Sequence, residues 1–357
     1  MRIGFVSGDY LPAQNASDGV HHWGGSGWAR LGQYVEWLEH LGKEMYTGVL
    51  VWKEDRFLIR DQHEQLNEVD MIIMQRLMHG SLAEHVGKAR SIGQIVVNDL
   101  DDWYWGLDPA NDAFKSSHPK TNPNENRDHY KKVLASSDIV TVSTQYLADR
   151  IKTFVHCPIV VLENTVDIAR FTPHVHTASS VPVVGWVGAT SHRSSDLEIM
   201  KGIINPLLAN NEIKFQHSGR YPSAPSVASK LGLHDDQVIT LDAVDARDYP
   251  SLLTMDVGIA PLRDTPFNHA KSDIKLLEYS ASGIPWVGSA LSSYEGLRKS
   301  WGIGRTANKP SQWLKHLRDL RDPIRRADEG EALREAVRSR DISLGAHRLN
   351  SLIEDLA

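Results

Sequence analysis

The feature that most constrains the fold of this chain is a regular alternation of short apolar runs with amphipathic stretches. In the first half, the segments 30–41 and 82–92 have the periodicity of amphipathic helices. Strands that alternate with helices predict parallel sheets covered on both faces, which is an α/β architecture. The apolar runs that we interpret as strands in this half are residues 2–7, 45–52, 69–75, 94–100, 139–144 and 158–164.

The pattern then starts again after a short interruption. Residues 171–180 contain Pro173, two histidines and a Ser-Ser pair, and we interpret them as a linker. A helix is expected at about 195–209. The strands predicted in this half are residues 181–188, 213–219, 237–242, 257–262 and 285–289.

Two doubly wound domains are therefore expected, one at residues 1–170 and one at 171–340, with a helix at about 341–357 able to pack back on the first. Ligands bind at the carboxyl ends of the strands in such sheets, so the two domains would face each other across a cleft.

Composition limits the classes of function. The 357 residues carry a formal net charge of −6, so a broad cationic surface for nucleic acid is not expected. Cys157 is the single cysteine, which excludes an internal disulfide and fits a reducing, cytoplasmic setting. The amino-terminal run lacks the long apolar core of a signal peptide, and no stretch approaches the roughly 18 apolar residues of a membrane span. We expect a cytoplasmic protein without an integral membrane segment, with peripheral membrane contact left open.

The segment KSDIKLLEYSASGIPWVG, residues 271–288, is the strongest candidate site. Lys271, Lys275 and Glu278 are spaced at i, i+4 and i+7, which puts them on one face of a predicted helix. Two lysines at a helix start suit a diphosphate, and a carboxylate one turn later suits ribose hydroxyls. The alternative is an exposed helix on which Lys275 pairs with surface acids.

The surrounding segment 256–289 resembles the nucleotide-sugar-binding segment of family 4 retaining glycosyltransferases of the GT-B fold. A strand ending in Pro-Leu leads through a loop to the donor helix, then to a Gly-x-Pro turn and another strand. The resemblance implies two Rossmann-like domains, with the nucleotide sugar bound by the second. The matching positions are Asp256, Pro261, Pro266, Phe267, Lys271, Ser272, Lys275, Glu278, Tyr279, Gly283 and Pro285.

Other segments extend the resemblance over most of the chain, namely residues 24–42, 98–105, 160–171 and 183–200. In the last of these, Gly188 matches a glycine turn that meets the diphosphate, and Arg193 matches the basic residue that follows. His192 matches a pattern found in one branch of the family. The resemblance implies that Arg193, Lys271 and Lys275 stabilise the leaving diphosphate. Gly188, His192 and Glu278 would bind the donor, as would Arg220, which follows a predicted strand end.

The chain also departs from the family pattern. Many members carry a second glutamate eight residues before the donor-helix glutamate, where this chain has Ala270. The lysine usually found after the arginine is missing as well. Lys271 is expected to supply that cation, and Asn268 or His269 to contact the sugar. The donor sugar and base therefore stay open.

On the acceptor side, Gly25, Ser26 and Gly27 belong to a glycine-rich segment that permits close approach of a substrate. Its distance from the first strand, and Arg30 after it, exclude a dinucleotide fingerprint. Asp101 and Asp102 are expected to orient an acceptor hydroxyl. The Asp99-x-Asp101 spacing could instead hold a divalent metal, or the acids could be structural, but GT-B enzymes as a class do not need that metal. We predict no metal and no cofactor besides the nucleoside diphosphate sugar.

The expected function is transfer of a sugar to an acceptor hydroxyl with retention of configuration. A glycan or lipid-linked glycan is the acceptor that the resemblance favours, with a protein side chain or a hydroxylated DNA base also open. The arginine-rich stretch from Arg298 to Arg340 is either a solvated helical surface or an acceptor-binding rim. A nucleotide-sugar epimerase of the same fold and a non-catalytic nucleotide-sugar-binding protein are the alternatives.

Overall fold

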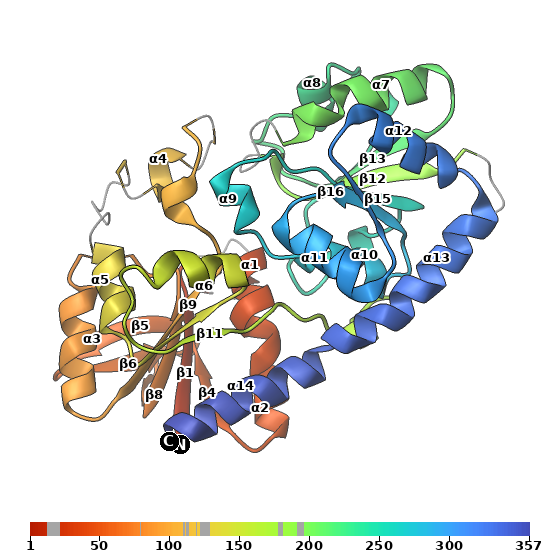
Figure 1. Cartoon of the computed structure of the whole chain (residues 1–357). Helices are drawn as coiled ribbons and strands as arrows, with labels where there is room; N and C mark the ends of the chain where they lie inside the picture. The colour runs from red at the N-terminus through yellow and green to blue at the C-terminus, as the bar shows by residue number, and fades with distance from the viewer. Residues whose placement is uncertain are drawn as a thin grey trace.

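The computed structural model describes residues 1–12, 22–78, 80–109, 111, 114–118, 120–121, 129–177, 181–190 and 196–357. Within these residues, the main strands form two six-stranded parallel sheets with helices on both faces. The two sheets lie in separate halves of the molecule, and the long helices near the carboxyl terminus run from one half to the other (Figure 1). This is the α/β architecture that the alternation of apolar and amphipathic segments predicts.

The first sheet has the strand order β11-β10-β9-β8-β1-β4, with every neighbouring pair parallel. Side chains on successive positions point to opposite faces. Ile3 and Phe5 of β1 pack in one hydrophobic cluster with helices α2 and α14, whereas Val6 packs in the other with α3 and α5. The strands are β1 (Arg2–Ser7), β4 (Glu44–Thr47), β8 (Met71–Gln75), β9 (Ile95–Leu100), β10 (Ile139–Val142) and β11 (Ile159–Val161).

The second sheet has the order β14-β13-β12-β15-β16-β17 and is also parallel throughout. Trp186 of β12 and Trp286 of β16 are buried on opposite faces of this sheet. The strands are β12 (Val183–Val187), β13 (Lys214–Arg220), β14 (Val238–Asp242), β15 (Val257–Ala260), β16 (Trp286–Ser289) and β17 (Arg305–Ala307).

Helices cover both faces of each sheet. Around the first sheet lie α1 (Gly25–Gly27), α2 (Gln33–His40), α3 (Leu82–Ser91), α4 (Phe114–Ser117), α5 (His129–Ser136), α6 (Gln145–Ile151) and α14 (Ile342–Leu356). Around the second lie α7 (Lys201–Ala209), α8 (Val227–Leu231), α9 (Pro266–His269), α10 (Ile274–Ala281), α11 (Ser292–Trp301), α12 (Pro310–Asp319) and α13 (Pro323–Ala336).

The apolar run 45–52 is two strands and not one. Gly48 separates β4 of the parallel sheet from β5 (Val49–Lys53). A Cβ at Gly48 would collide with the carbonyl oxygen of Arg60, so only glycine fits at this break. Strand β5 pairs antiparallel with β6 (Arg56–Arg60), which pairs with β7 (Leu66–Glu68). The strand prediction missed this small sheet, because β6 carries an arginine at each end and β7 is short.

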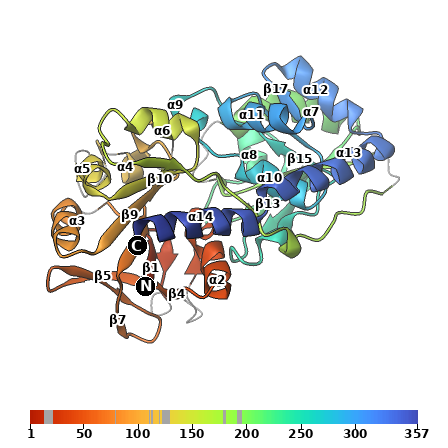
Figure 2. The same ribbon diagram turned by 60° about the horizontal axis from the view of Figure 1, so that its bottom comes forward.

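The carboxyl-terminal helix α14 packs against α2 of the first half. Its buried side chains Ile342, Ala346 and Leu349 belong to the same cluster as Ile3 and Phe5. Both views place the two chain ends next to each other (Figures 1 and 2). None of the helices in the described part of the chain is long and apolar enough to span a membrane.

The arginines between Arg298 and Arg340 are largely engaged within the protein. Arg305 binds Glu329 at 2.8 Å, and Arg318 binds Glu212 at 2.9 Å. Arg326 is fully buried and donates to backbone carbonyl groups. Arg340 binds Asp273 at 3.0 Å and the carbonyl of Asn164. These pairs support the interpretation of the stretch as structural and solvated surface, not as a free basic rim.

Candidate functional site

The candidate site is a cleft between the carboxyl ends of the two parallel sheets. A cavity of about 1820 Å³ is lined on one side by residues that follow β1 and β8, and on the other by residues that follow β12 and β13. A second cavity of about 290 Å³ adjoins it beside α10. The two cavities share Gly25, Ser26, Asp102, Gly188, Ala246, Tyr249 and Lys271.

On the side of the second sheet, Lys275 lies at a glycine turn. Lys275 is buried in the first turn of α10, and its ammonium donates to the carbonyl of Val187 and lies 5.3 Å above the ring of Trp186. Gly188 follows β12 with a φ of +142°, and a Cβ there would lie 3.4 Å from Lys275 Nζ. The turn, the ammonium and the positive end of the helix dipole together suit an anionic ligand.

Lys271 does not share the helix with Lys275 and Glu278. Helix α10 begins at Ile274 after Asp273, whose carboxylate binds Arg340, so Lys271 lies in the connection from α9. The prediction of one face with three charges was therefore wrong for Lys271. Its ammonium lies 3.3 Å from Asp102 Oδ1 of the opposite half and 4.2 Å from the Phe267 ring. Lys271 nevertheless lines both cavities.

Glu278 lies one turn along α10 from Lys275 and lines the smaller cavity. The hydroxyl of Tyr249 donates to Glu278 Oε2 at 2.7 Å, which holds one carboxylate oxygen in place. The Glu278 carboxylate is therefore an anionic hydrogen-bond acceptor one helical turn from Lys275. A lysine followed one turn later by a carboxylate is the arrangement that the sequence pattern predicts for a phosphate next to a ribose.

Several predicted site residues lie elsewhere or cannot be placed. Asn268 is buried and donates to Asp196 at 2.8 Å, and it lines neither cavity. Arg220 is exposed and binds Asp242 at 2.6 Å. Residues His192 and Arg193 lie outside the described part of the chain.

The glycine-rich segment is the start of a helix and not a loop. Gly25 and Ser26 line both cavities from α1, which continues through a π-helical turn (Trp28–Gly32) into α2. The backbone amide of Gly27 donates to Asp9 at 3.0 Å, and a Cβ at Gly27 would collide with that carboxylate. Glycine is therefore required here for packing against Asp9.

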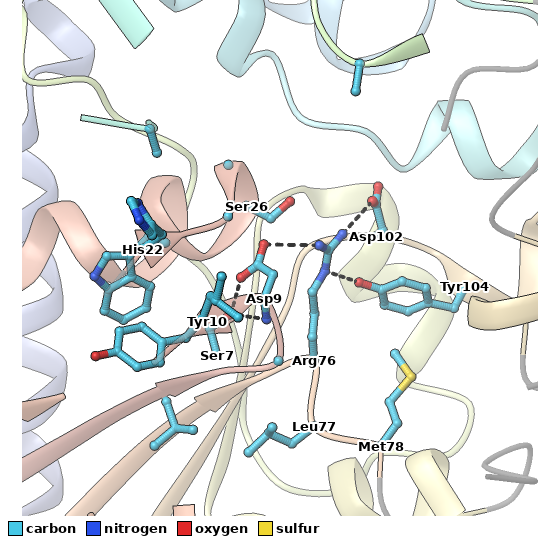
Figure 3. A pocket seen from close by; sticks show the side chains of 18 of the residues that line it. Ser7, Asp9, Tyr10, His22, Ser26, Arg76, Leu77, Met78, Asp102 and Tyr104 are labelled. Atoms are coloured by element: carbon cyan, nitrogen blue, oxygen red, sulfur yellow. Dashed lines mark hydrogen bonds and ion pairs between the residues drawn. The ribbon is translucent and has the colours of Figure 1, made fainter. Parts of the chain in front are cut away.

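A cluster of carboxylates around Arg76 forms the other side of the cleft. Arg76 follows β8 in a left-handed conformation, with φ +60°. Its guanidinium lies 3.4 Å from Asp9, 3.2 Å from Asp101 and 3.4 Å from Asp102, and it donates to the hydroxyl of Tyr104. Asp9, Asp102 and Tyr104 all point toward it (Figure 3).

The charges in this cluster support one another. Burial by itself lowers the pKa of Arg76, but the nearby carboxylates, Asp101 above all, raise it well above its ordinary value. Burial raises the pKa of Asp101, yet Arg76 and hydrogen bonds from Tyr104 and Ser26 bring it below its ordinary value. Both groups therefore stay charged at neutral pH. The prediction did not include Arg76 or Asp9, although Arg76 directly follows one predicted strand and Asp9 lies two residues after another, where site residues are expected.

Asp99 is not placed to bind a metal together with Asp101. The buried guanidinium of Arg30 holds Asp99 at 2.6 Å, and Thr141 donates to the same carboxylate. Arg76 occupies Asp101 and Asp102. The arrangement therefore favours hydrogen bonding to an acceptor over metal coordination by the Asp99-x-Asp101 motif.

Comparison with known proteins identifies the fold. A sucrose-phosphate synthase from Thermosynechococcus elongatus superposes with a TM-score of 0.65 at 13% identity, over 100% of this chain and 99% of that one. A glycosyltransferase from Rickettsia africae ESF-5 gives 0.65 at 12% identity, over 99% and 98%. The chain thus has the GT-B fold, with two Rossmann-like domains facing across a cleft.

Sequence comparison is more limited. The chain matches no protein-family model. One curated relative, a candidate teichuronic acid biosynthesis glycosyltransferase named TuaH from Bacillus subtilis (strain 168), is 28% identical over 99 residues. The match covers 28% of this chain and only about a fifth (21%) of that protein.

The fold by itself does not decide the activity. A candidate UDP-N-acetylglucosamine 2-epimerase from Listeria monocytogenes superposes with a TM-score of 0.54 at 11% identity, over 99% of this chain and 95% of that one. Transferases and an epimerase are thus both among the structural neighbours, and the residues of the cleft must discriminate between them.

Proposed function

We propose that this protein is a glycosyltransferase that moves a sugar from a nucleoside diphosphate sugar to an acceptor hydroxyl. The observation that carries the proposal is the convergence of the Gly188 turn, Lys275, Lys271 and Glu278 on one cavity beside α10. A cavity lined by two lysines, one of them at a glycine turn, with a carboxylate one helical turn from that lysine, is complementary to a diphosphate linked to a ribose.

In this proposal, the second half of the chain, residues 171–340, binds the donor. Lys275 and Lys271 neutralise the negative charge that grows on the leaving diphosphate, which is electrostatic stabilisation of the transition state. Arg193 would add to it, as the family resemblance implies. Gly188 allows the diphosphate to approach the backbone, and Glu278, held by Tyr249, accepts hydrogen bonds from the ribose hydroxyls.

The first half, residues 1–170, would bind the acceptor. Asp101 and Asp102 lie across the cleft from the donor lysines, and Asp102 contacts Lys271 at 3.3 Å. A hydroxyl bound at Asp102 would lie beside the proposed diphosphate. Gly25 and Ser26 line the same region and leave room for a substrate.

The transfer breaks the bond between the anomeric carbon and the phosphate oxygen and forms a bond to the acceptor oxygen. With retention of configuration, which the resemblance favours, the departing phosphate takes the acceptor proton. No metal or further cofactor is required by this scheme, because lysines provide the positive charge. A glycan or lipid-linked glycan is the favoured acceptor, and a protein side chain or hydroxylated DNA base remains an alternative. We propose a cytoplasmic location, which leaves peripheral membrane contact open.

The carboxylate cluster around Arg76 favours a catalytic protein over one that only binds nucleotide sugars, which needs no charged groups facing the donor. An epimerase of this fold would also use buried carboxylates near the anomeric carbon, so it is distinguished from a transferase by the absence of a second substrate. Here Asp9, Asp101 and Asp102 are ordered by one arginine on the wall opposite the lysines. That wall provides polar groups for an acceptor next to the reacting carbon.

The experiment is a panel of nucleoside diphosphate sugars added without acceptor to wild type and Glu278→Gln. We expect one donor to raise the melting temperature and to be hydrolysed slowly, with free nucleoside diphosphate released. Glu278→Gln should lose most of that stabilisation, since a neutral amide is a weaker acceptor for ribose hydroxyls.

Glu331→Gln is the matched control, because Glu331 is exposed on α13 and lines neither cavity. It should respond to the donor as wild type does. If no nucleotide sugar stabilises the wild-type protein, the donor site is not where we place it. Conversion of the donor to an epimer without release of nucleotide would identify an epimerase instead.

A further inference from the structure

Outside the cleft, three side chains with metal-binding atoms meet where the linker crosses the edge of the second sheet. His174 and His176 lie on the irregular segment 171–177, and Asp256 directly precedes β15. One ligand atom from each residue lies within 4.8 Å of those of the other two. The rings of His174 and His176 contact each other edge-on, with centroids 4.8 Å apart, so the His-x-His spacing brings both rings beside Asp256. Val175 between them is 81% exposed.

His176 has a buried nitrogen that nothing in the described residues satisfies. Its Nε2 lies 2.9 Å from the carbonyl oxygen of Gly283. A carbonyl only accepts, so Nε2 carries the hydrogen and Nδ1 is left with a lone pair. Nδ1 is buried and has no hydrogen-bond partner there. Leaving a buried polar atom unsatisfied costs free energy, so Nδ1 is available to bind a metal ion.

The same hydrogen bond is the one that orients metal-binding histidines in proteins. A histidine ligand usually donates its second ring nitrogen to a carbonyl or carboxylate, which fixes the tautomer and directs the other nitrogen to the metal.

His174 and Asp256 supply the other two candidate ligands. His174 Nε2 lies 3.2 Å from Asp256 Oδ1, while Asp256 Oδ2 accepts a hydrogen bond from the amide of Val183 at 2.8 Å. Tetrahedral zinc with bonds of about 2.0–2.2 Å sets its ligand atoms roughly 3.3–3.5 Å apart. The distance of 3.2 Å between His174 Nε2 and Asp256 Oδ1 is close to this range. The longest distance between ligand atoms is at most 4.8 Å, so it would have to shorten by at most about 1.5 Å.

We propose that His174, His176 and Asp256 form a structural Zn²⁺ site, with water as the fourth ligand. The ion would join the linker to the start of β15 and, through His176 and Gly283, to the end of α10, the helix that carries Lys275 and Glu278. Two imidazoles and one carboxylate favour zinc over magnesium or calcium, which prefer oxygen ligands.

Arg326 is the charged group that opposes a cation here. Its guanidinium donates to the carbonyl of Thr177 at 3.2 Å, next to His176. The Asp256 carboxylate is therefore needed to offset its charge, and Asp256→Asn should weaken zinc binding as strongly as loss of a histidine does.

The test is a zinc titration of the full chain after treatment with chelator, followed by calorimetry and by melting temperature. We expect one zinc per chain and a higher melting temperature with zinc. His176→Ala, His174→Gln and Asp256→Asn should each weaken binding by on the order of 100-fold. His234→Ala, at the histidine that precedes the helical turn before β14, should bind zinc as wild type does.

A second measurement keeps the proposal testable if a variant unfolds. Co²⁺ in place of Zn²⁺ should give wild-type protein the visible absorption of a tetrahedral ion, and one equivalent of Zn²⁺ should abolish it. Wild-type protein that takes up no zinc, or variants that fold and bind it equally well, would overturn the proposal. Neither result depends on nucleotide binding in the cleft.

Discussion

Lys275 is the residue on which the proposed donor site depends most. Its ammonium is buried against Trp186 and the Val187 carbonyl, at the turn where a diphosphate would lie. Because little water surrounds the ammonium, its attraction to a bound anion is screened less than that of a lysine on the surface.

Lys275→Met keeps the aliphatic stem and removes the charge. A charged hydrogen bond contributes about 1.5–3 kcal/mol, so affinity for the best nucleoside diphosphate should fall roughly 10- to 150-fold. Isothermal titration calorimetry measures this change. Lys315→Met, at an exposed lysine of α12, is the control and should leave affinity unchanged. Equal affinity in both variants would exclude Lys275 from the donor site.

Tyr249→Phe tests how Glu278 is held. The substitution removes the hydroxyl that donates to Glu278 at 2.7 Å and changes little else in volume. We expect a loss of about 1 kcal/mol in ribonucleotide binding, roughly fivefold. A 2′-deoxynucleotide should lose less, because it makes fewer bonds to Glu278. Equal losses for both nucleotides would argue that Glu278 does not contact the ribose.

At the scale of single residues, the sequence predicts which charged side chains lie together on one helix, but not which residues from distant segments become neighbours. Helical periodicity was enough to pair Lys275 with Glu278. It could not place Asp9, Arg76 and Asp101 together, because they come from three different strand ends and meet only in the folded sheet. Strand-end position was the one signal available for Arg76 and Asp9.

Among the elements, the turn after β12 shapes the cavity. Gly188 has φ +142°, and an added Cβ would lie 3.2 Å from Trp186 and 3.4 Å from Lys275 Nζ. The backbone conformation therefore favours glycine, and the close approach of the Trp186 ring adds to this preference.

Gly188→Ala should destabilise the fold by at least about 1 kcal/mol and also weaken donor binding, because the new methyl group points at Lys275. Gly202→Ala is the matched control. Gly202 is exposed in α7 with open space around it, and alanine there should stabilise by up to about 1 kcal/mol. Denaturant unfolding and nucleotide titration of both variants measure the two effects. A Gly188→Ala protein that binds donor normally would contradict this account of the turn.

Helix α11 and strand β17 are joined by a carboxylate whose contribution depends on pH. Glu295 accepts from Arg298 at 2.7 Å and from Thr306 at 2.6 Å, and these bonds lower its pKa from 4.5 to about 2. A lowered pKa in the folded state means that the stabilisation is present above pH 4.5 and is lost as the pH falls toward 2.

Glu295→Gln should therefore lower the melting temperature at pH 7, and the difference from wild type should shrink as the pH falls below about 4.5. Melting curves across this range measure it. A difference that stays constant with pH would mean that the ionised form of Glu295 is not what stabilises the pair.

Element boundaries were predictable where apolar runs are long and failed where one residue changes the backbone direction. The apolar run 45–52 gives no sign of the break at Gly48, because glycine is needed there only where Arg60 approaches it in the folded structure. The start of α10 was set three residues too early, because Asp273 is held by Arg340, a residue 67 positions away.

In the whole molecule, the two halves contact each other through ion pairs and hydrogen bonds at the cleft. Asp102 pairs with Lys271, and His22 pairs with Asp245 at 2.5 Å. Asn164 donates to Ser272 at 2.7 Å close to the same cavity. A diphosphate bound at Lys271 would compete with Asp102, so donor binding and the position of the acceptor wall should be coupled.

Asp102→Asn tests this coupling. Losing the partly buried pair, worth up to about 1 kcal/mol, should free Lys271 and tighten donor binding by up to roughly fivefold. Transfer to acceptor should slow, because the carboxylate that faces the acceptor is gone. Asp108→Asn is the control: Asp108 also pairs across the halves, with Arg263 at 3.9 Å, but neither residue has a proposed role in donor binding. Weaker donor binding in Asp102→Asn would contradict the competition.

The two-sheet architecture and the cleft between strand ends followed from the sequence, because the alternation pattern and the strand-end rule do not depend on details of packing. The arrangement of one half against the other did not, since it depends on pairs such as Asp102 with Lys271 that are 169 residues apart.

The central claim is that a nucleoside diphosphate sugar binds beside α10. Hydrogen–deuterium exchange of the protein with and without a panel of nucleoside diphosphates tests it most directly. We predict that one nucleotide protects the peptides that cover residues 187–189 and 271–281, while peptides of α14 exchange as before. Protection confined to the first sheet, or no protection by any nucleotide, would contradict the account.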